Sequence, residues 1–161
     1  MILMSIHEGI LMKVLEKIPL KVKKLPHAIC EPTYATSGSV GMDLSAALEK
    51  PLYIKPMEKF AVPTGLIFEV PEGYEAQIRA RSGLSIKHGI SLVNGVGTID
   101  SDFRGEVKVL IINLGDKTYT INPGDRIAQA IISPVAKADI DIVVEVNETD
   151  RSSGGFGSTG S

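Results

Sequence analysis

The chain has 161 residues, the size of one domain built around one hydrophobic core. Its residues are 43% hydrophobic and 22% charged, and 16 glycines and 9 prolines interrupt it, which excludes a disordered chain and a helical bundle. The formal net charge of −2 argues against a stable complex with nucleic acid or with an anionic membrane.

The predicted elements follow an N-terminal segment, residues 1–18, which we interpret as an extension or as a mis-assigned start. This segment is rich in apolar residues, but Glu8 and Lys13 interrupt it, and it lacks the features of a secretory signal. Met12 is a candidate for the true first residue. Nowhere does an apolar run approach the roughly 18 to 20 residues of a membrane-spanning helix, so no membrane association is expected.

From Leu20 onward, short apolar or alternating runs recur about every ten residues between turn residues, which is typical of a β-sandwich or β-barrel. We therefore expect an all-β domain of eleven short strands over residues 19–147. In chain order the predicted strands are Lys21–Leu25, Leu52–Lys55, Phe60–Val62, Gly65–Val70, Glu75–Arg81, Ile90–Val93, Val96–Ile99, Glu106–Leu114, Lys117–Ile121, Arg126–Ser133 and Ile142–Val146.

Two of these elements carry specific expectations. In the strand Glu75–Arg81, apolar and polar residues alternate, which places Arg81 at a strand end. Asn94-Gly95 lies between two predicted strands, and this dipeptide is typical of a type I′ turn, so we expect a hairpin there.

Cysteine and histidine are scarce in this chain. Cys30 is the only cysteine, which excludes an internal disulfide, and with three scattered histidines no closed zinc site is expected. A chain without disulfides fits a reducing compartment, and we expect a cytoplasmic protein.

Arginine placement is the most informative chemical feature of the sequence. Because a guanidinium presents a planar fork to phosphate oxygens, arginines beside glycine-rich turns are candidate phosphate ligands; the alternative is a surface ion pair. All five arginines lie after residue 78: Arg79, Arg81, Arg104, Arg126 and Arg151. The segment Arg81-Ser82-Gly83-Leu84 suits either a phosphate-binding nest or a plain turn that ends a strand.

Three further segments leave alternatives open. Asp100-Ser101-Asp102 could bind a metal, polarise a water or cap a turn, and Gly124-Asp125-Arg126 by itself indicates a turn that leads into a strand. The Gly-rich end, residues 148–161, indicates a flexible arm and lacks the strand and helix that flank a P-loop. The arm could also close over a nucleotide, with Phe156 on the base.

Taken together, five ordered motifs resemble those of the trimeric dUTP diphosphatase (dUTPase) family. They are Gly38 to Ala46 (GSVGMDLSA), Arg81 to Leu84 (RSGL), Asn94 to Gly105 (NGVGTIDSDFRG), Gly124 to Gln129 (GDRIAQ) and Arg151 to Gly160 (RSSGGFGSTG). The resemblance implies a jelly-roll-like β-barrel that forms a homotrimer, with each active site built from three subunits and closed by a C-terminal arm.

The implied activity is the Mg²⁺-dependent hydrolysis of dUTP to dUMP and pyrophosphate, a phosphoric anhydride cleavage that keeps uracil out of DNA and supplies dUMP for thymidylate synthesis. In the matching positions, Asp100 would be the general base that holds the attacking water at the α-phosphorus. Asp43 would contact the magnesium through water, with a structural role as the alternative.

The resemblance also implies a set of substrate-binding residues. These are Arg81, Ser82, Gly83, Asn94, Gly97, Thr98, Ile99, Asp100, Phe103, Gln129, Arg151, Phe156, Gly157 and Ser158. Arg81, Ser82, Gln129 and Arg151 would donate to phosphate oxygens. The Asn94 side chain and the backbone near Gly97 would read the uracil edge, and Phe156 would cover the base.

Two positions depart from the family pattern. Phe103 stands where the family usually has a tyrosine that packs on the deoxyribose; we predict that the phenyl ring retains discrimination against UTP. In addition, Ser152 follows Arg151 where a glycine is common, which bears on the flexibility of the arm.

Two other functions remain as alternatives. The first is a dCTP deaminase, or a bifunctional deaminase-diphosphatase, which shares the barrel; it needs a suitably placed glutamate, and no pattern recruits Glu106. The second is a non-catalytic trimer that binds a nucleotide or a partner protein. Nothing in the sequence argues for lost catalysis, because Asp100 and the phosphate ligands are all present.

Overall fold

The structure is a computed structural model that describes residues 17–155. This part of the chain forms twelve strands and one short helix. They are β1 (Lys21–Lys24), β2 (Thr33–Tyr34), β3 (Met42–Ser45), β4 (Leu52–Ile54), β5 (Lys59–Pro63), β6 (Leu66–Glu69), β7 (Tyr74–Arg79), α2 (Ser82–His88), β8 (Ile90–Leu92), β9 (Val96–Ile99), β10 (Lys108–Asn113), β11 (Tyr119–Ile121) and β12 (Arg126–Pro134).

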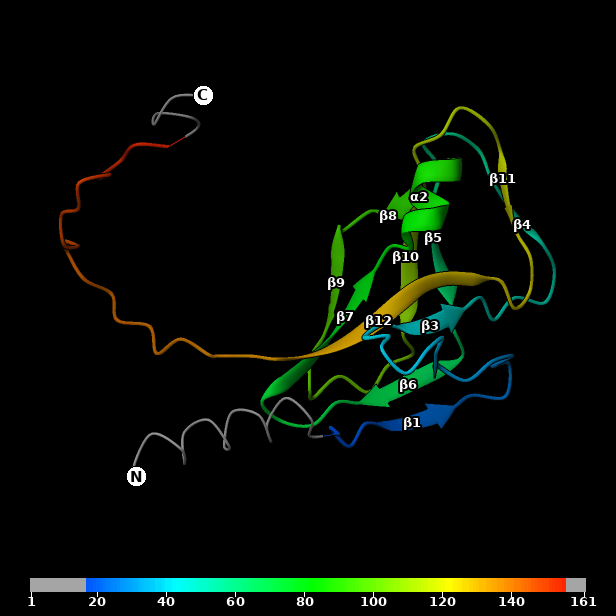
Figure 1. Cartoon of the computed structure of the whole chain (residues 1–161), viewed down its shortest axis with the longest axis horizontal. Coiled ribbons are helices and arrows are strands. Elements are labelled where there is room, and N and C mark those ends of the chain that lie inside the picture. Colours follow the sequence, from blue (N-terminus) through cyan, green and yellow to red (C-terminus); the bar gives the residue numbers. More distant parts are fainter. Residues whose placement is uncertain (1–16, 156–161) are drawn as a thin grey trace.

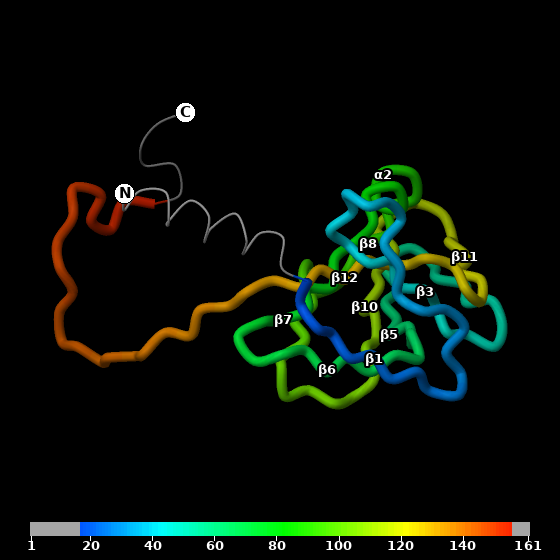
Figure 2. Tube along the Cα trace, turned by 60° about the horizontal axis from the view of Figure 1, so that its bottom comes forward, coloured from blue at the N-terminus to red at the C-terminus, as the bar shows by residue number. Residues whose placement is uncertain are grey.

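The strands pair in antiparallel fashion into four small sheets that wrap around one core (Figure 1). The largest sheet has the order β2-β3-β12-β7-β9, a second has the order β5-β10-β8, and the pairs β1-β6 and β11-β4 complete the wall. Helix α2 lies at one end and the β1-β6 pair at the other, as both views show (Figure 2). The predicted all-β, jelly-roll-like barrel is thereby confirmed.

Alternation along the strands explains where the core lies. In β10, Val109 and Ile111 are fully buried whereas Lys108 and Leu110 face outward, and in β7 Ala76 and Ile78 are buried. Phe68 on β6 is the largest fully buried side chain. Most strands therefore contribute one apolar face to a shared interior, which leaves the other face and the strand ends to position functional groups.

Ten of the eleven predicted strands are present, and the prediction is wrong for Ile142–Val146. Beyond Pro134 the chain leaves the barrel and runs away from it in both views (Figures 1 and 2). The side chain of Ile142 is 90% exposed and that of Val144 100% exposed. The alternating pattern is real, but a strand needs a neighbour for its backbone groups, and the described part of this single chain supplies none to this segment.

The predicted hairpin at Asn94-Gly95 is also wrong. Strand β8 pairs with β10, whereas β9 pairs with β7, so the turn carries the chain from one sheet to another. Only Gly95 takes a positive φ, of 67°, whereas a type I′ turn needs a positive φ at both residues. The turn is closed instead by the Gly95 N–H, which donates to the Leu92 carbonyl at 3.2 Å.

Asn113, at the end of β10, is a fully buried polar residue that satisfies three backbone groups. Its side-chain amide donates to the Ile54 carbonyl at 2.8 Å and to the Lys117 carbonyl at 2.7 Å, and its side-chain oxygen accepts the Gly115 N–H at 2.9 Å. Asn113 therefore ties the β10–β11 turn to β4.

Replacing Asn113 by Ala is expected to lower the free energy of unfolding by about 3 kcal/mol, because buried backbone groups lose their partners. Urea unfolding at fixed protein concentration measures this change. The control is Asn122→Ala on the exposed β11–β12 turn, where the side chain bonds Asp125 at 3.2 Å and the expected loss is below about 1 kcal/mol. Equal losses in the two variants would contradict the role given to Asn113.

Two further sequence-based expectations concern the N-terminal segment and membrane-spanning helices. The extension predicted over residues 1–18, with Met12 in it, lies almost entirely outside the described residues. Among the residues that the structure describes, no helix is long and apolar enough to cross a membrane.

Candidate active site

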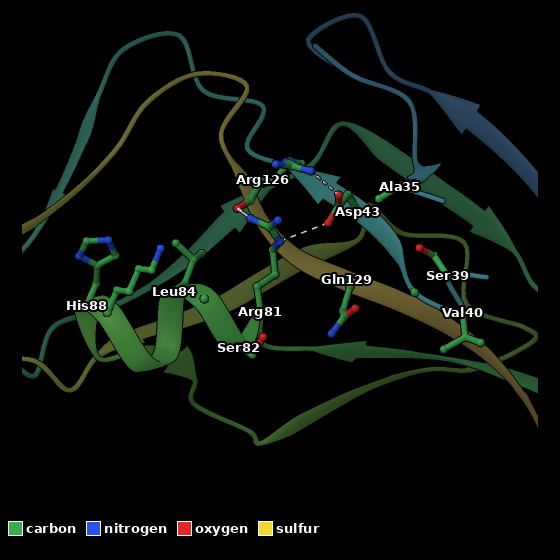
Figure 3. A pocket seen from close by; sticks show the side chains of 13 residues that line it. Ala35, Ser39, Val40, Asp43, Arg81, Ser82, Leu84, His88, Arg126 and Gln129 are labelled. Carbon is green, nitrogen blue, oxygen red and sulfur yellow. Dashed lines mark hydrogen bonds and ion pairs between the residues drawn. The ribbon is translucent and has the colours of Figure 1, made fainter. Parts of the chain in front are cut away.

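A cavity of about 570 Å³ lies where α2 meets strands β3 and β12 (Figure 3). Several predicted site residues meet here, together with two residues, Gly41 and Arg126, that were not in the predicted ligand set. The residues that carry its chemistry are Gly41, Asp43, Arg81, Ser82, Arg126 and Gln129.

Asp43 lies between two arginines in this cavity. Its Oδ1 is 3.2 Å from Arg81 Nε, and its Oδ2 is 2.9 Å from Arg126 Nη1. Arg81 Nη1 also donates to the Arg126 carbonyl at 3.1 Å. The side chains of Asp43 and Arg81 are 14% and 28% exposed, so their ion pair is partly shielded from water and holds the Arg81 guanidinium in one place, whereas the Arg126 side chain is 56% exposed. Two guanidinium groups against one carboxylate leave a net positive charge, which suits an anionic ligand.

Helix α2 begins directly after Arg81, where the sequence allowed a plain turn. Leu84 and Ser85 donate their N–H groups to the Arg81 carbonyl at 3.0 Å each, so the N–H groups of Ser82 and Gly83 lie in the first turn without a helical acceptor. Gly89 ends the helix with a φ of 70°. A Cβ at Gly83 would meet nothing within 4 Å, so a ligand can approach this backbone closely.

Gln129 is on β12, opposite Asp43 on β3, and its amide donates to the Ala80 carbonyl at 3.3 Å. The side chain lies against Gly41, where any Cβ would collide with the Gln129 carboxamide. A glycine at position 41 therefore gives Gln129 the space to reach the cavity beside Arg81.

A second cavity, of about 240 Å³, lies between the turn that follows β8 and the loop that follows β9. It collects the predicted base and sugar ligands, and Gly97 forms part of its wall. A Cβ at Gly97 would stand 3.3 Å from Ile78 Cβ and 3.2 Å from Asn94 Nδ2, so any larger residue would narrow the cavity. The residues on its wall that were predicted to bind substrate are Asn94, Gly97, Thr98, Ile99 and Phe103.

Phe103 lies in the loop that joins β9 to β10, and its ring covers Gly105, where a Cβ would collide with the ring carbons. The ring is 41% exposed and forms part of the wall of the second cavity. The third motif, Asn94 to Gly105, thus combines the flat apolar ring of Phe103 with a glycine, Gly105, that makes room for the ring.

Asp100 is exposed at the end of β9, where its carbonyl accepts the Phe103 N–H at 3.2 Å. It lines a third hollow, of about 870 Å³, together with Ser101 and Arg104. The cavity that contains Arg81 does not include Asp100, so this chain holds the proposed base and the phosphate ligands in separate places.

Arg151, the one predicted C-terminal ligand among the described residues, lines neither the Arg81 cavity nor the second cavity. Arg151 is exposed on the segment that leaves the barrel, and its Nε donates to the Gly154 carbonyl at 2.8 Å. Phe156, Gly157 and Ser158 lie outside the described residues.

Arg126 was one of the five candidate phosphate-binding arginines, but the motifs did not place it among the substrate ligands, and its contact with Asp43 was not predicted. Alone, Gly124-Asp125-Arg126 indicates a turn, and the Asp43 partner is 83 residues away in the chain. The pairing of β3 with β12 brings them together. A pairing between two such distant strands leaves no local pattern, so the sequence carried no usable signal for this contact.

A bound metal would find few protein ligands here. Within residues 17–155, no three His, Cys, Asp or Glu side chains are grouped in a way that could hold a metal ion. Both oxygens of Asp43 are already paired with arginines. A divalent cation at this site would therefore depend on oxygen ligands from a bound anion and from water.

Comparison with known proteins identifies close relatives. A model of the dUTPase family matches residues 28–160. The chain is 54% identical over 148 residues to deoxyuridine 5'-triphosphate nucleotidohydrolase of Aquifex aeolicus, which covers 91% of this chain and 99% of that protein.

Solved structures agree with this result. The dUTPase of Staphylococcus bacteriophage 80alpha with dUPNHPP superimposes with a TM-score of 0.80 at 26% identity, over 89% of this chain and 99% of that one. A mutant dUTPase of phage phi11 of S. aureus, whose structure reveals the coordination of a structural Mg(II) ion, gives a TM-score of 0.71 at 25% identity. That alignment covers 79% of this chain and 97% of the phage protein.

Proposed function

The chain belongs to the dUTPase family, and on that premise we propose how its residues hydrolyse dUTP to dUMP and pyrophosphate. The observation that carries the assignment is the 54% identity to a dUTP nucleotidohydrolase over nearly the whole of both chains. The enzyme class predicted from the five motifs is thereby confirmed, and the deaminase alternative is not favoured. Glu106, the glutamate near the site motifs that was weighed for a deaminase, already accepts the Gly65 N–H and contacts His27.

Asp100 is the proposed general base. Its exposed place at the end of β9 supports this role, because the carboxylate is free to hold a water in line with the α-phosphorus. Asp100 accepts a proton from that water as a bond forms between the water oxygen and the α-phosphorus. The bond that breaks joins the α-phosphorus to the bridging oxygen, which leaves with pyrophosphate.

Arg81, Ser82 and Gln129 are proposed to bind the phosphates, with Gly83 giving them access to the backbone. Their meeting in one positively charged cavity supports the proposal. As pyrophosphate departs, negative charge grows on its oxygens, and donors that are already fixed in place stabilise that charge without reorganisation. Asp43 contributes by fixing Arg81 through the ion pair described above.

We further propose that the reaction depends on Mg²⁺. Since the described residues group no three metal-binding side chains, magnesium would take most of its ligands from the phosphates and water, and when bound it would neutralise phosphate charge. The sequence left Asp43 either a water-mediated contact to the metal or a structural role. Its two ion pairs support the structural role.

The second cavity is proposed to hold the uracil and the sugar. Asn94 and the backbone near Gly97, with Thr98 and Ile99 beside them, would contact the base. The small volume of this cavity, about 240 Å³, supports selection against a larger base such as thymine.

Phe103 is expected to preserve discrimination against a ribose. The ratio of kcat/KM for dUTP over UTP should be at least about 10, because steric exclusion and stacking together supply at least about 1.4 kcal/mol. Phe103→Ala should bring the ratio toward 1, whereas the control Phe103→Tyr, which keeps the ring, should not lower it. Parallel kinetics with the two nucleotides measure the ratio, and a value below about 10 in the wild type would refute the prediction.

A homotrimer with shared active sites is proposed next. Two features of the single chain support it: the phosphate ligands and Asp100 line different cavities, and the segment beyond Pro134 exposes Ile142, Val144 and Val146 to water. Such apolar side chains favour burial against another subunit. Sedimentation at the mass of one chain would contradict this arrangement.

The C-terminal arm, residues 148–161, is proposed to close over the site of another subunit. Arg151 would then reach phosphate oxygens, and Phe156, with Gly157 and Ser158, would cover the base. The length of chain that leaves the barrel after β12 supports this reach. We also propose a cytoplasmic location, from the lone Cys30, and no stable nucleic acid partner, from the net charge of −2.

The assay that tests the function measures pyrophosphate release with Mg²⁺ from dUTP, dTTP, dCTP and UTP, with the nucleotide products identified. Release from dUTP alone, with dUMP as product, is the expected result. Deamination of dCTP would move the chain to the deaminase alternative. Nucleotide binding without any turnover would favour the non-catalytic trimer.

A further inference from the structure

Glu106 lies just after the loop that contains Phe103, and one of its oxygens is held from two directions. Oε1 accepts the Gly65 N–H at 2.8 Å and lies 2.7 Å from His27 Nε2, which donates when it carries the proton. The Glu106 side chain is 15% exposed. A surface glutamate rarely has both features, so this carboxylate has a defined position.

The surroundings of this contact are rigid. Val107, the next residue, is fully buried; its N–H donates to the Leu66 carbonyl at 2.8 Å, and its carbonyl accepts the Thr64 hydroxyl at 2.7 Å. Gly65 has a φ of 71°, and a Cβ there would collide with the backbone of Ala28. Glu106 is thus fastened to a part of the barrel that has little freedom to move.

The groups around Glu106 favour its ionised carboxylate. Burial raises the pKa of its carboxyl, but hydrogen bonds from His27 and from the Gly65 N–H, with the nearby positive charge of Lys108, outweigh this and leave the pKa below its usual range. The group is therefore ionised at neutral pH and accepts hydrogen bonds only.

The loop between β9 and Glu106 has few other attachments. On its N-terminal side Ile99 pairs with Ala76, and within the loop Phe103 N–H bonds the Asp100 carbonyl at 3.2 Å. Arg104 donates to the carbonyls of Ser101 and Phe103, both inside the same loop. Among the hydrogen bonds of the described residues, the one from the Gly65 N–H to Glu106 is therefore the first after Phe103 that joins this loop to another part of the barrel. Glu106 also lines the second cavity beside Phe103.

We propose that Glu106 is a positioning residue for the dUTPase reaction, which holds the Phe103 ring over the nucleoside cavity by anchoring its loop to Gly65 and His27. The proposal rests on the assignment of that cavity to uracil and the sugar. In this proposal the two functional residues of the loop are positioned separately. The pairing of β9 with β7 positions Asp100, whereas Glu106 positions Phe103.

The experiment compares product inhibition in variants at this position. Glu106→Ala should raise KM for dUTP and the inhibition constant for dUMP about tenfold each, because dUMP needs the nucleoside cavity. Inhibition by pyrophosphate, which the Arg81 cavity binds, should change by less than about twofold. The dUTP over UTP ratio should fall as well. A purely structural defect would instead weaken both inhibitors alike.

Three further variants make the result specific. Glu106→Gln keeps an acceptor for the Gly65 N–H and should shift dUMP inhibition by only about two- to threefold, while His27→Ala removes one of the two partners and should fall between these values. Glu31→Ala, which breaks the exposed ion pair with Lys24 at 3.1 Å, should leave both inhibition constants unchanged.

The outcomes separate this proposal from the site assignment. If Phe103→Ala weakens dUMP and Glu106→Ala does not, the proposal for Glu106 is overturned and the sugar site stands. If neither variant weakens dUMP, the site assignment fails and the proposal fails with it. Should Glu106→Ala not fold, the graded pair Glu106→Gln and His27→Ala decides, and equal weakening of dUMP and pyrophosphate in both would overturn the proposal.

Discussion

Replacing Asp100 by Asn is expected to lower kcat for dUTP by about a thousandfold, with little change in the inhibition constant for pyrophosphate. The amide has nearly the shape of the carboxylate, so the turn after β9 keeps its geometry, but the amide oxygen does not accept a proton from water at neutral pH. The substrate would still bind through the Arg81 cavity and the nucleoside cavity. Most of the loss should therefore appear in kcat.

Asp102 offers a matched control for this prediction. It lies two residues after Asp100 in the same exposed loop and has the same charge. Asp102→Asn should change kcat by less than about threefold. Equal losses in the two variants would show that the net charge of the loop matters and not one positioned carboxylate. Single-turnover measurement of dUMP formation is the suitable readout, since it isolates the chemical step from product release.

The sequence predicted the strands well because their signal is local. Alternation and turn residues located ten strands, but strand pairing depends on contacts between distant segments, which explains the error at Asn94-Gly95. β2 and β3 were missed, because β2 has only two residues and Met42–Ser45 was recognised only as part of a motif. Helix α2 has seven residues, too few to show helical periodicity. Ile142–Val146 has the pattern of a strand without a partner in the described chain.

The candidate site was predictable to the extent that short motifs carry it. Resemblance placed Arg81, Ser82 and Gln129 among the phosphate ligands, and the structure gathers them in one cavity. The contacts between motifs were not predictable. Arg126 joins the site through Asp43, and Glu106 through Gly65 and His27, and each contact links segments more than 40 residues apart. These contacts between distant segments fix the positions of the residues that hold a ligand. No local pattern in the sequence predicts them.

Mixing two inactive variants is expected to restore activity if the sites are shared between subunits. Arg81→Ala removes a phosphate ligand and Asp100→Asn removes the base, so each homotrimer should be nearly inactive. When the two chains are unfolded in urea, mixed in equal amounts and refolded, trimers assemble at random. A site that takes Arg81 from one subunit and Asp100 from its neighbour is then intact in about a quarter of cases. We therefore expect about a quarter of wild-type activity from the mixture.

A second mixture tests the same geometry without depending on the return of activity from two inactive variants. Wild-type chain is mixed in equal amounts with the double variant Arg81→Ala, Asp100→Asn. If each site needs two neighbouring subunits, about a quarter of the sites remain intact, whereas sites within one chain would leave about half. Zero recovery in the first mixture and half in the second would place Arg81 and Asp100 in one subunit. That result would require the loop after β9 to move toward α2 when substrate binds, because in the structure of the single chain Arg81 and Asp100 line different cavities.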